Sequence, residues 1–117
     1  MTPMEYIEAS GVPESTWERC GWFERNRLMG VVRDNQNEIA GVALCRMIYA
    51  NEKPAPYVHH EDGDDVFIDL TVTSIDGKPT SQSKIALKRL LWILFENAGP
   101  RRRIIFNRSG RHRSYDY

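Results

Sequence analysis

The sequence lacks the features that would point to a secreted or membrane protein. Its two cysteines, Cys20 and Cys45, stand in segments of different character without a CxxC spacing, so we expect reduced, packed thiols rather than a disulfide or zinc site. No stretch approaches the ~18 uncharged apolar residues that a membrane helix needs. The start, MTPMEYIEAS, has two glutamates where a signal peptide has basic residues and an apolar run. We therefore expect a cytoplasmic protein without a membrane partner.

Net charge is also lacking, because two unlike regions cancel. Residues 1–100 have a balance of −5, whereas residues 101–117 contain six arginines and one aspartate, a balance of +5. Regional charge matters more for partners than the total. The length of 117 residues, 41% of them hydrophobic and 27% charged, is typical of one soluble globular domain over residues 1–117.

Two short helices are predicted at the amino end. Thr2, Pro3 and Glu5 have the pattern of an N-cap, a first-turn proline and a capping-box acid, and Gly11 ends this helix. A second helix is expected to begin near Pro13.

Three strands should follow. Residues 28–33 and 38–50 predict a hairpin around a turn at 34–37, with a second strand that is apolar on both faces. Residues 51–65 contain strand breakers and an acidic patch, which indicates a solvated loop. Residues 66–74 predict the third strand, with side chains that point alternately to its two faces. Strict alternation places Val66, Ile68, Leu70 and Val72 on one face and Asp69 on the wetter face.

A leucine-rich helix is predicted over residues 80–98, capped by Thr80 or Ser81 and stopped by Gly99 and Pro100. Residues 101–108 read as a last strand, and residues 109–117 as a tail too short for another helix. The sequence therefore predicts an α+β domain: two helices, an antiparallel three-strand meander, then a helix and a final strand parallel to its neighbour.

This order resembles the GNAT superfamily of acyl-CoA-dependent N-acyltransferases over residues 2 to about 107. LTV at 70–72 matches the strand that holds the acyl thioester, and SKIALKRLL at 83–91 matches the helix whose amino end receives the cofactor pyrophosphate. The resemblance implies acetyl-CoA or another acyl-CoA as cofactor and a small-molecule or peptide amine as acceptor. It implies cofactor contacts from Leu70, Val72, Thr80, Ser81, Gln82, Ser83 and Lys84.

The chain departs from the family in its pyrophosphate loop. Gly77, Thr80 and Gln82 stand where the family has Arg or Gln, then Gly, then Gly or Ala. Glycines let backbone amides approach a phosphate. Without them, the hydroxyl, amide and ammonium groups of residues 80–84 could replace the missing donors, or the serine and threonine there could serve only to cap the helix. The resemblance therefore implies either an active enzyme or an inactive relative. The sheet is also shorter than in the family, and an exposed edge could pair with a second copy in a homodimer.

Catalytic candidates are Asp69 as the base for the amine and Tyr115 as the acid for the leaving thiolate, the tyrosine only if the tail folds back. His59, His60 and Glu61 are further base candidates. The alternative for Asp69 is a structural salt bridge, for example to Arg46. The spacing of HHEDGDD at 59–65 matches no established ligand pattern, so we expect no metal site.

The arginine-rich end offers a second hypothesis. The chain would then be a non-enzymatic module that binds nucleic acid or a protein partner. Its contact residues would be Arg101, Arg103, Arg108, Arg111 and Arg113. The opposing interpretation is that these arginines neutralise the acidic remainder of the domain. A pI near 6.8 is far from the basic footprint of nucleic-acid-binding domains.

Overall fold

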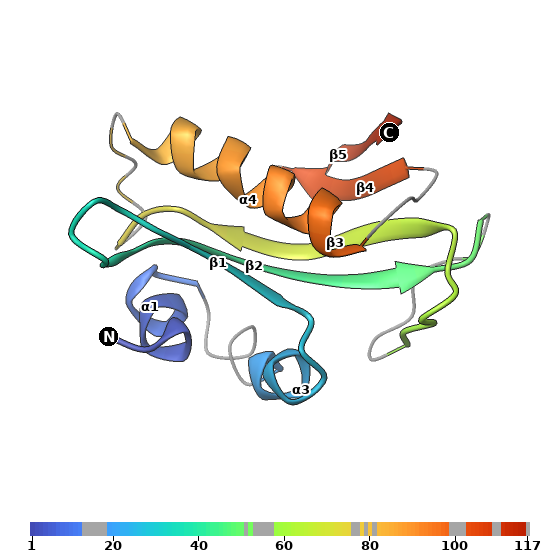
Figure 1. Cartoon of the computed structure of the whole chain (residues 1–117), viewed down its shortest axis with the longest axis horizontal. Helices are drawn as coiled ribbons and strands as arrows, with labels where there is room; N and C mark the ends of the chain where they lie inside the picture. The colour runs from blue at the N-terminus through green and yellow to red at the C-terminus, as the bar shows by residue number, and fades with distance from the viewer. Residues whose placement is uncertain are drawn as a thin grey trace.

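The computed structural model in Figure 1 describes residues 1–12, 19–50, 52, 58–75, 78, 80, 82–98, 103–108 and 111–116. Its helices are α1 (Pro3–Ala9), α3 (Cys20–Arg25) and α4 (Ser83–Ala98). Its strands are β1 (Met29–Arg33), β2 (Ile39–Ile48), β3 (Asp65–Val72), β4 (Arg103–Arg108) and β5 (Arg111–Asp116). The described strands form one mixed sheet in the order β1-β2-β3-β4-β5. The α+β class is therefore confirmed.

Strand directions follow the prediction up to β4. The β1–β2 and β2–β3 pairs are antiparallel, and β3 pairs with β4 in parallel after the α4 connection. The expectation that residues 109–117 are only a tail is wrong for β5, which pairs antiparallel with β4. The segment has no apolar alternation, but main-chain hydrogen bonds to the exposed edge of β4 do not require one.

Helix α4 covers one face of the sheet (Figure 1). Ala86, Leu90 and Leu94 of this helix are buried against side chains of all four strands from β1 to β4. A Cβ on Gly41 would lie 2.9 Å from the Leu90 Cδ1 atom, so the bare glycine lets the helix sit close to β2.

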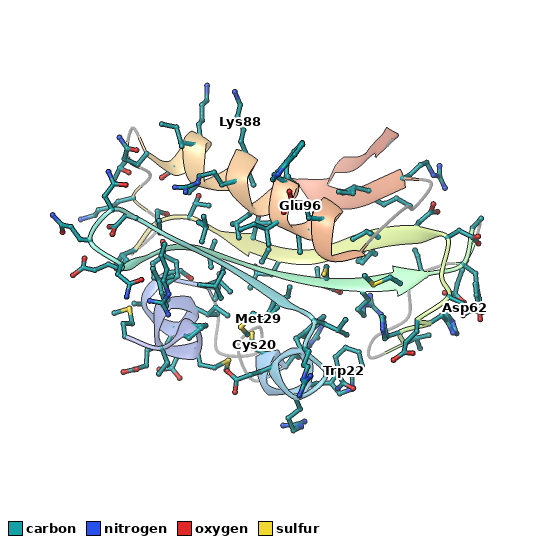
Figure 2. The ribbon with its side chains drawn as sticks, viewed as in Figure 1. Cys20, Trp22, Met29, Asp62, Lys88 and Glu96 are labelled. Carbon is teal, nitrogen blue, oxygen red and sulfur yellow. The ribbon has the colours of Figure 1, made fainter. Side chains whose placement is uncertain are left out.

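Helices α1 and α3 cover the opposite face (Figure 1). Tyr6 and Ile7 of α1 and Cys20 and Phe23 of α3 are buried against Val42, Leu44 and Val72 of the sheet. Cys20 lies beside Met29 in this layer (Figure 2). Both cysteines are free and buried, as expected.

A β-bulge in β3 corrects the predicted strand faces. Leu44 pairs with Leu70 and the next residue, Cys45, pairs with Ile68, so Asp69 is the extra residue. Because the bulge breaks the two-residue alternation, Val66 and Ile68 pack under α4 whereas Leu70 and Val72 pack with α1 and α3. The prediction that these four side chains share a face is wrong.

The helix ends agree with the local signals. Thr2 Oγ1 accepts from the Glu5 amide at 3.1 Å, and Glu5 Oε1 accepts from the Thr2 amide at 2.9 Å, which is the predicted capping box. The expected helix start near Pro13 lies outside the described residues. The predicted helix over residues 80–98 begins at Ser83 instead. No helix in the described part of the chain is long and apolar enough to cross a membrane.

Candidate functional site

Among the described strands, β4 pairs with only the first half of β3. Pairing between the two strands runs from Asp65–Arg103 to Ile68–Phe106, and β3 then continues to Val72. Asp69 is exposed as a whole residue although its side chain is only 24% exposed, so the main chain provides much of this exposure. Thr71 is exposed as well. We call residues 69–72 the open stretch.

The amino end of α4 begins close to the end of β3 and uses its hydroxyls internally. Thr80 Oγ1 accepts from the Gln82 amide at 3.2 Å. Ser83 Oγ accepts from the Thr80 amide and donates to the Thr73 carbonyl oxygen, each at 2.9 Å. Thr80 therefore accepts a capping-type hydrogen bond just ahead of α4, whose first residue is Ser83. Ser81 lies outside the described residues, and Lys84 is exposed on the first turn of the helix.

Asp69 binds Arg46 with both carboxylate oxygens. Arg46 Nε and Nη2 donate to Oδ2 and Oδ1 of Asp69 at 2.9 and 3.0 Å, and Arg46 Nη1 donates to the Val58 carbonyl oxygen at 3.1 Å. The guanidinium carbon lies 5.3 Å from the centre of the Phe67 ring. The predicted alternative, a salt bridge to Arg46, is confirmed.

Burial and pairing act on Asp69 in opposite directions. Burial is the larger effect and raises the pKa of the Asp69 carboxyl above its ordinary value, although hydrogen bonds and attraction from Arg46 oppose it. The side chain of Arg46 is only 3% exposed, so both charges share a poorly hydrated site. A carboxylate with a raised pKa is a better proton acceptor, but here both its oxygens already bind a cation.

The other base candidates lie at the far end of β2. His59 Nδ1 accepts from the Met47 amide at 3.0 Å. His60 Nε2 lies 3.2 Å from a carboxylate oxygen of Glu52, and its ring stacks on Tyr49 at 4.0 Å between centroids. Tyr49 donates to Asp62, which raises the pKa of the tyrosine. Figure 2 shows Asp62 at the opposite end of the sheet from the amino end of α4.

These groups hold the 58–64 segment against β2 rather than forming a metal centre. The His60 amide donates to the Met47 carbonyl oxygen at 2.9 Å. Among the described residues, no group of three or more His, Cys, Asp or Glu side chains could hold a metal ion. Glu61 is exposed in the same segment.

The predicted acid lies on β5, and the described members of the arginine cluster are divided between β4 and β5. Tyr115 of β5 pairs with Ile104 of β4, and its side chain lies outside the described part. Arg103 donates from Nη2 to Oδ2 of Asp65 at 3.1 Å, and the Asp65 side chain is 1% exposed. Arg101 is not described, and for Arg108, Arg111 and Arg113 only the backbone is described.

Sequence reasoning missed a pocket of about 300 Å³ at the tip of the β1–β2 hairpin. Its walls come from α1, from the hairpin, from residues 73–75 and from the amino end of α4. We call it the hairpin pocket. Because these segments are far apart in the chain, no local motif could have indicated it. Two of the predicted cofactor-binding residues, Thr80 and Gln82, line it.

Comparisons with known proteins add no relative: no family model matches the chain, and neither the curated proteins nor the solved structures contain a match.

Proposed function

We propose that this chain is a GNAT-like domain that binds an acyl-CoA thioester along the open stretch of β3. The observation that carries the proposal is the end of β3–β4 pairing at Ile68 and Phe106, just before the bulge at Asp69. The order of helices and strands through β4, with α4 leading into a parallel neighbour, supports the same assignment.

An open strand edge suits the pantetheine part of coenzyme A. Its two amides can exchange main-chain hydrogen bonds with β3 as an added strand would, and a free N–H group can bind the thioester oxygen. Leu70 and Val72 would contribute backbone groups only, since their side chains pack towards α1 and α3.

Binding of the diphosphate is expected to depend on Lys84 and the helix dipole. The hydroxyls of Thr80 and Ser83 are already used in capping, so they are poor substitutes for the family's glycines. This arrangement favours modest affinity for coenzyme A.

If the domain is active, an acceptor amine attacks the thioester carbonyl, an amide bond forms and the carbon–sulfur bond breaks. The proton from the amine goes to a base and the leaving thiolate takes up a proton. Asp69 would be the base and Tyr115 the acid. Because Asp69 is held by Arg46 through both oxygens, we favour the version in which the domain binds the cofactor but has lost catalysis.

A thermal-shift titration with acetyl-CoA tests the proposal. At a cofactor concentration 100 times Kd, binding stabilises the native state by about 2.7 kcal/mol, a melting-temperature rise of roughly 10 °C for a domain of this size. Lys84→Glu should lose most of this rise. Lys88→Glu is the matched control, because Lys88 is exposed one turn further along α4 and points away from the sheet (Figure 2).

Amide shift mapping by NMR locates the ligand. Acetyl-CoA should move the amide signals of residues 69–72 and leave those of the 58–64 segment in place. No thermal shift with millimolar acetyl-CoA, or equal losses in the two lysine variants, would contradict the proposal.

A second candidate is the anion-binding module at the arginine-rich end. One observation favours it: the β4–β5 register places the backbones of Arg108 and Arg111 opposite each other, which brings two of the predicted contact residues to the same end of this strand pair. Binding to an oligonucleotide that weakens steeply with salt would support this candidate. Its absence at low salt would exclude it.

A further inference from the structure

The hairpin pocket lies beyond the end of β3: Thr73, Ser74 and Ile75, which follow Val72 in the chain, line it together with residues of the hairpin and of α4. Figure 1 shows the hairpin tip and the amino end of α4 at the same end of the molecule. A neighbouring hollow of about 240 Å³ shares Tyr6, Ile39 and Ile75 with it. Together they exceed the lower size limit of about 300 Å³ that is usual for small-molecule sites.

We infer that the hairpin pocket binds a small zwitterion with an apolar body, the chemical class of an apolar amino acid. This inference differs from the acyl-CoA proposal in its ligand and in the charged residues that carry it, Asp34 and Arg89, although Thr80 and Gln82 belong to both sites.

The body of the pocket is apolar. Its apolar lining comes from Val32 and Ile39 of the hairpin, from Ile85 and Ala86 of α4, and from Ile75. Ile75 and Ile85 are 45% and 51% exposed, which is unusual for large aliphatic side chains and leaves apolar area for a ligand to cover.

The lining contains one acidic and one basic side chain, Asp34 and Arg89, beside the uncharged polar residues Tyr6, Thr73, Ser74, Thr80 and Gln82. Asp34 Oδ1 accepts from the Gln36 and Glu38 amides at 2.8 and 3.0 Å, which fixes the carboxylate at the hairpin turn. Its Oδ2 atom accepts no hydrogen bond from the described residues and can receive an ammonium group.

Arg89 supplies the opposite charge from α4. It lines the pocket but forms no hydrogen bond or ion pair with any residue in the described part of the chain, Asp34 included. The residues three and four positions away on the helix are Ile85, Ala86, Trp92 and Ile93, so its own helix offers no carboxylate. Its planar guanidinium can bind a carboxylate through two parallel hydrogen bonds.

The two charges together define the ligand class. A simple anion would be attracted by Arg89 but repelled by Asp34, and a simple cation would meet the reverse. A ligand with both an ammonium and a carboxylate satisfies the two side chains while its apolar part covers the aliphatic walls.

Isothermal titration of the full chain, without acetyl-CoA, tests the inference with four probes. L-leucine and L-phenylalanine have all three features, 4-methylpentanoate lacks the ammonium, and isopentylamine lacks the carboxylate. We expect at least one amino acid to bind at millimolar concentration or below, and each single-charge probe to bind about tenfold more weakly than leucine.

Variants link the binding to the pocket. Arg89→Gln and Asp34→Asn should each weaken amino-acid binding about tenfold, and Lys88→Gln, its neighbour on α4 outside the pocket, should leave the affinity unchanged. Asparagine keeps an oxygen that can accept from the hairpin amides, so the fold is retained. The inference is overturned if neither amino acid binds at millimolar concentration, if 4-methylpentanoate or isopentylamine binds as tightly as leucine, or if Arg89→Gln behaves like Lys88→Gln. The amino-acid titration is judged by Arg89→Gln and the acetyl-CoA titration by Lys84→Glu, so the two proposals can fail separately.

Discussion

The Arg46–Asp69 pair allows a specific test of how burial and charge balance in this sheet. Arg46→Met leaves the Asp69 carboxylate, 24% exposed, without its cation and removes the bond to Val58. Breaking a buried pair by removing one partner costs about 3–5 kcal/mol, and we expect the lower end because Asp69 retains some contact with water. Urea unfolding at neutral pH should show this loss.

Adding Asp69→Asn to Arg46→Met should restore part of the stability that Arg46→Met loses. Because burial outweighs pairing at Asp69 and raises its pKa, the carboxylate itself is a cost to the folded state. Asp69→Asn alone leaves the buried Arg46 cation unpaired, with an amide NH2 group facing one of its N–H donors, so we expect this single variant to lose about 3–5 kcal/mol as well. Arg46→Met with Asp69→Asn should then be more stable than Arg46→Met alone by about 2 kcal/mol, since paired charges can be replaced together at little cost. Additive effects of the two substitutions would refute the reasoning.

The same variants should differ in pH dependence. A carboxyl whose pKa is raised by folding contributes stability below its unfolded pKa, close to 3.8, and loses that contribution as the pH rises through the folded pKa. Arg46→Met removes the opposing cation, so its stability should improve more steeply than that of the wild type as the pH falls from neutral towards 4. The double variant, which lacks the carboxyl, should not show this improvement.

Four further predictions concern packing, helix propensity and thiol chemistry. A Cβ on Gly63 would lie 2.8–2.9 Å from backbone atoms of β2, so Gly63→Ala should cost about 1–3 kcal/mol in urea unfolding. Gly21→Ala, inside helix α3 and facing only the end of a flexible arginine, should instead gain about 0.5–1 kcal/mol. Burial raises the pKa of Cys45 to about 12, so a thiol-specific reagent at mildly alkaline pH should react with it only as fast as the protein opens. Rapid modification of the native protein would contradict that burial. Leu90→Ala, at a fully buried position, should lower the free energy of unfolding by about 2–5 kcal/mol in urea unfolding. Trp92→Ala, at a side chain that is 65% exposed, should lower it by about 0.5 kcal/mol or less.

Local signals in the sequence predicted much of the fold. The Thr2–Glu5 capping box and the apolar second strand of the hairpin each depend on a few neighbouring residues, so a linear pattern contains them, whereas the predicted stop at Gly99 and Pro100 lies outside the described residues. The parallel β3–β4 pair followed from the intervening helix.

Features that depend on distant partners could not be predicted. The bulge at Asp69 exists because β3 must match β2 on one side while ending its pairing with β4 on the other, and no single segment specifies that. Strand β5 has arginine, histidine and serine where a strand pattern needs apolar residues. It forms a strand because its main chain pairs with the edge of β4. The hairpin pocket combines four separate segments for the same reason.

The Arg46–Asp69 salt bridge could be predicted from the sequence, whereas its geometry could not. A carboxylate in an apolar strand needs a partner, and Arg46 on the adjacent strand was the suitable one. The two oxygens that bind it, and the third bond to Val58, depend on the bulge turning Asp69 out of the regular alternation.

The bulge also has a thermodynamic consequence. Since β3 contributes Val66 and Ile68 to one apolar layer and Leu70 and Val72 to the other, neither layer can melt without releasing a strand that the second layer needs. Heating should therefore dissolve both layers in a single cooperative transition, with equal calorimetric and van't Hoff enthalpies, rather than in two separate steps.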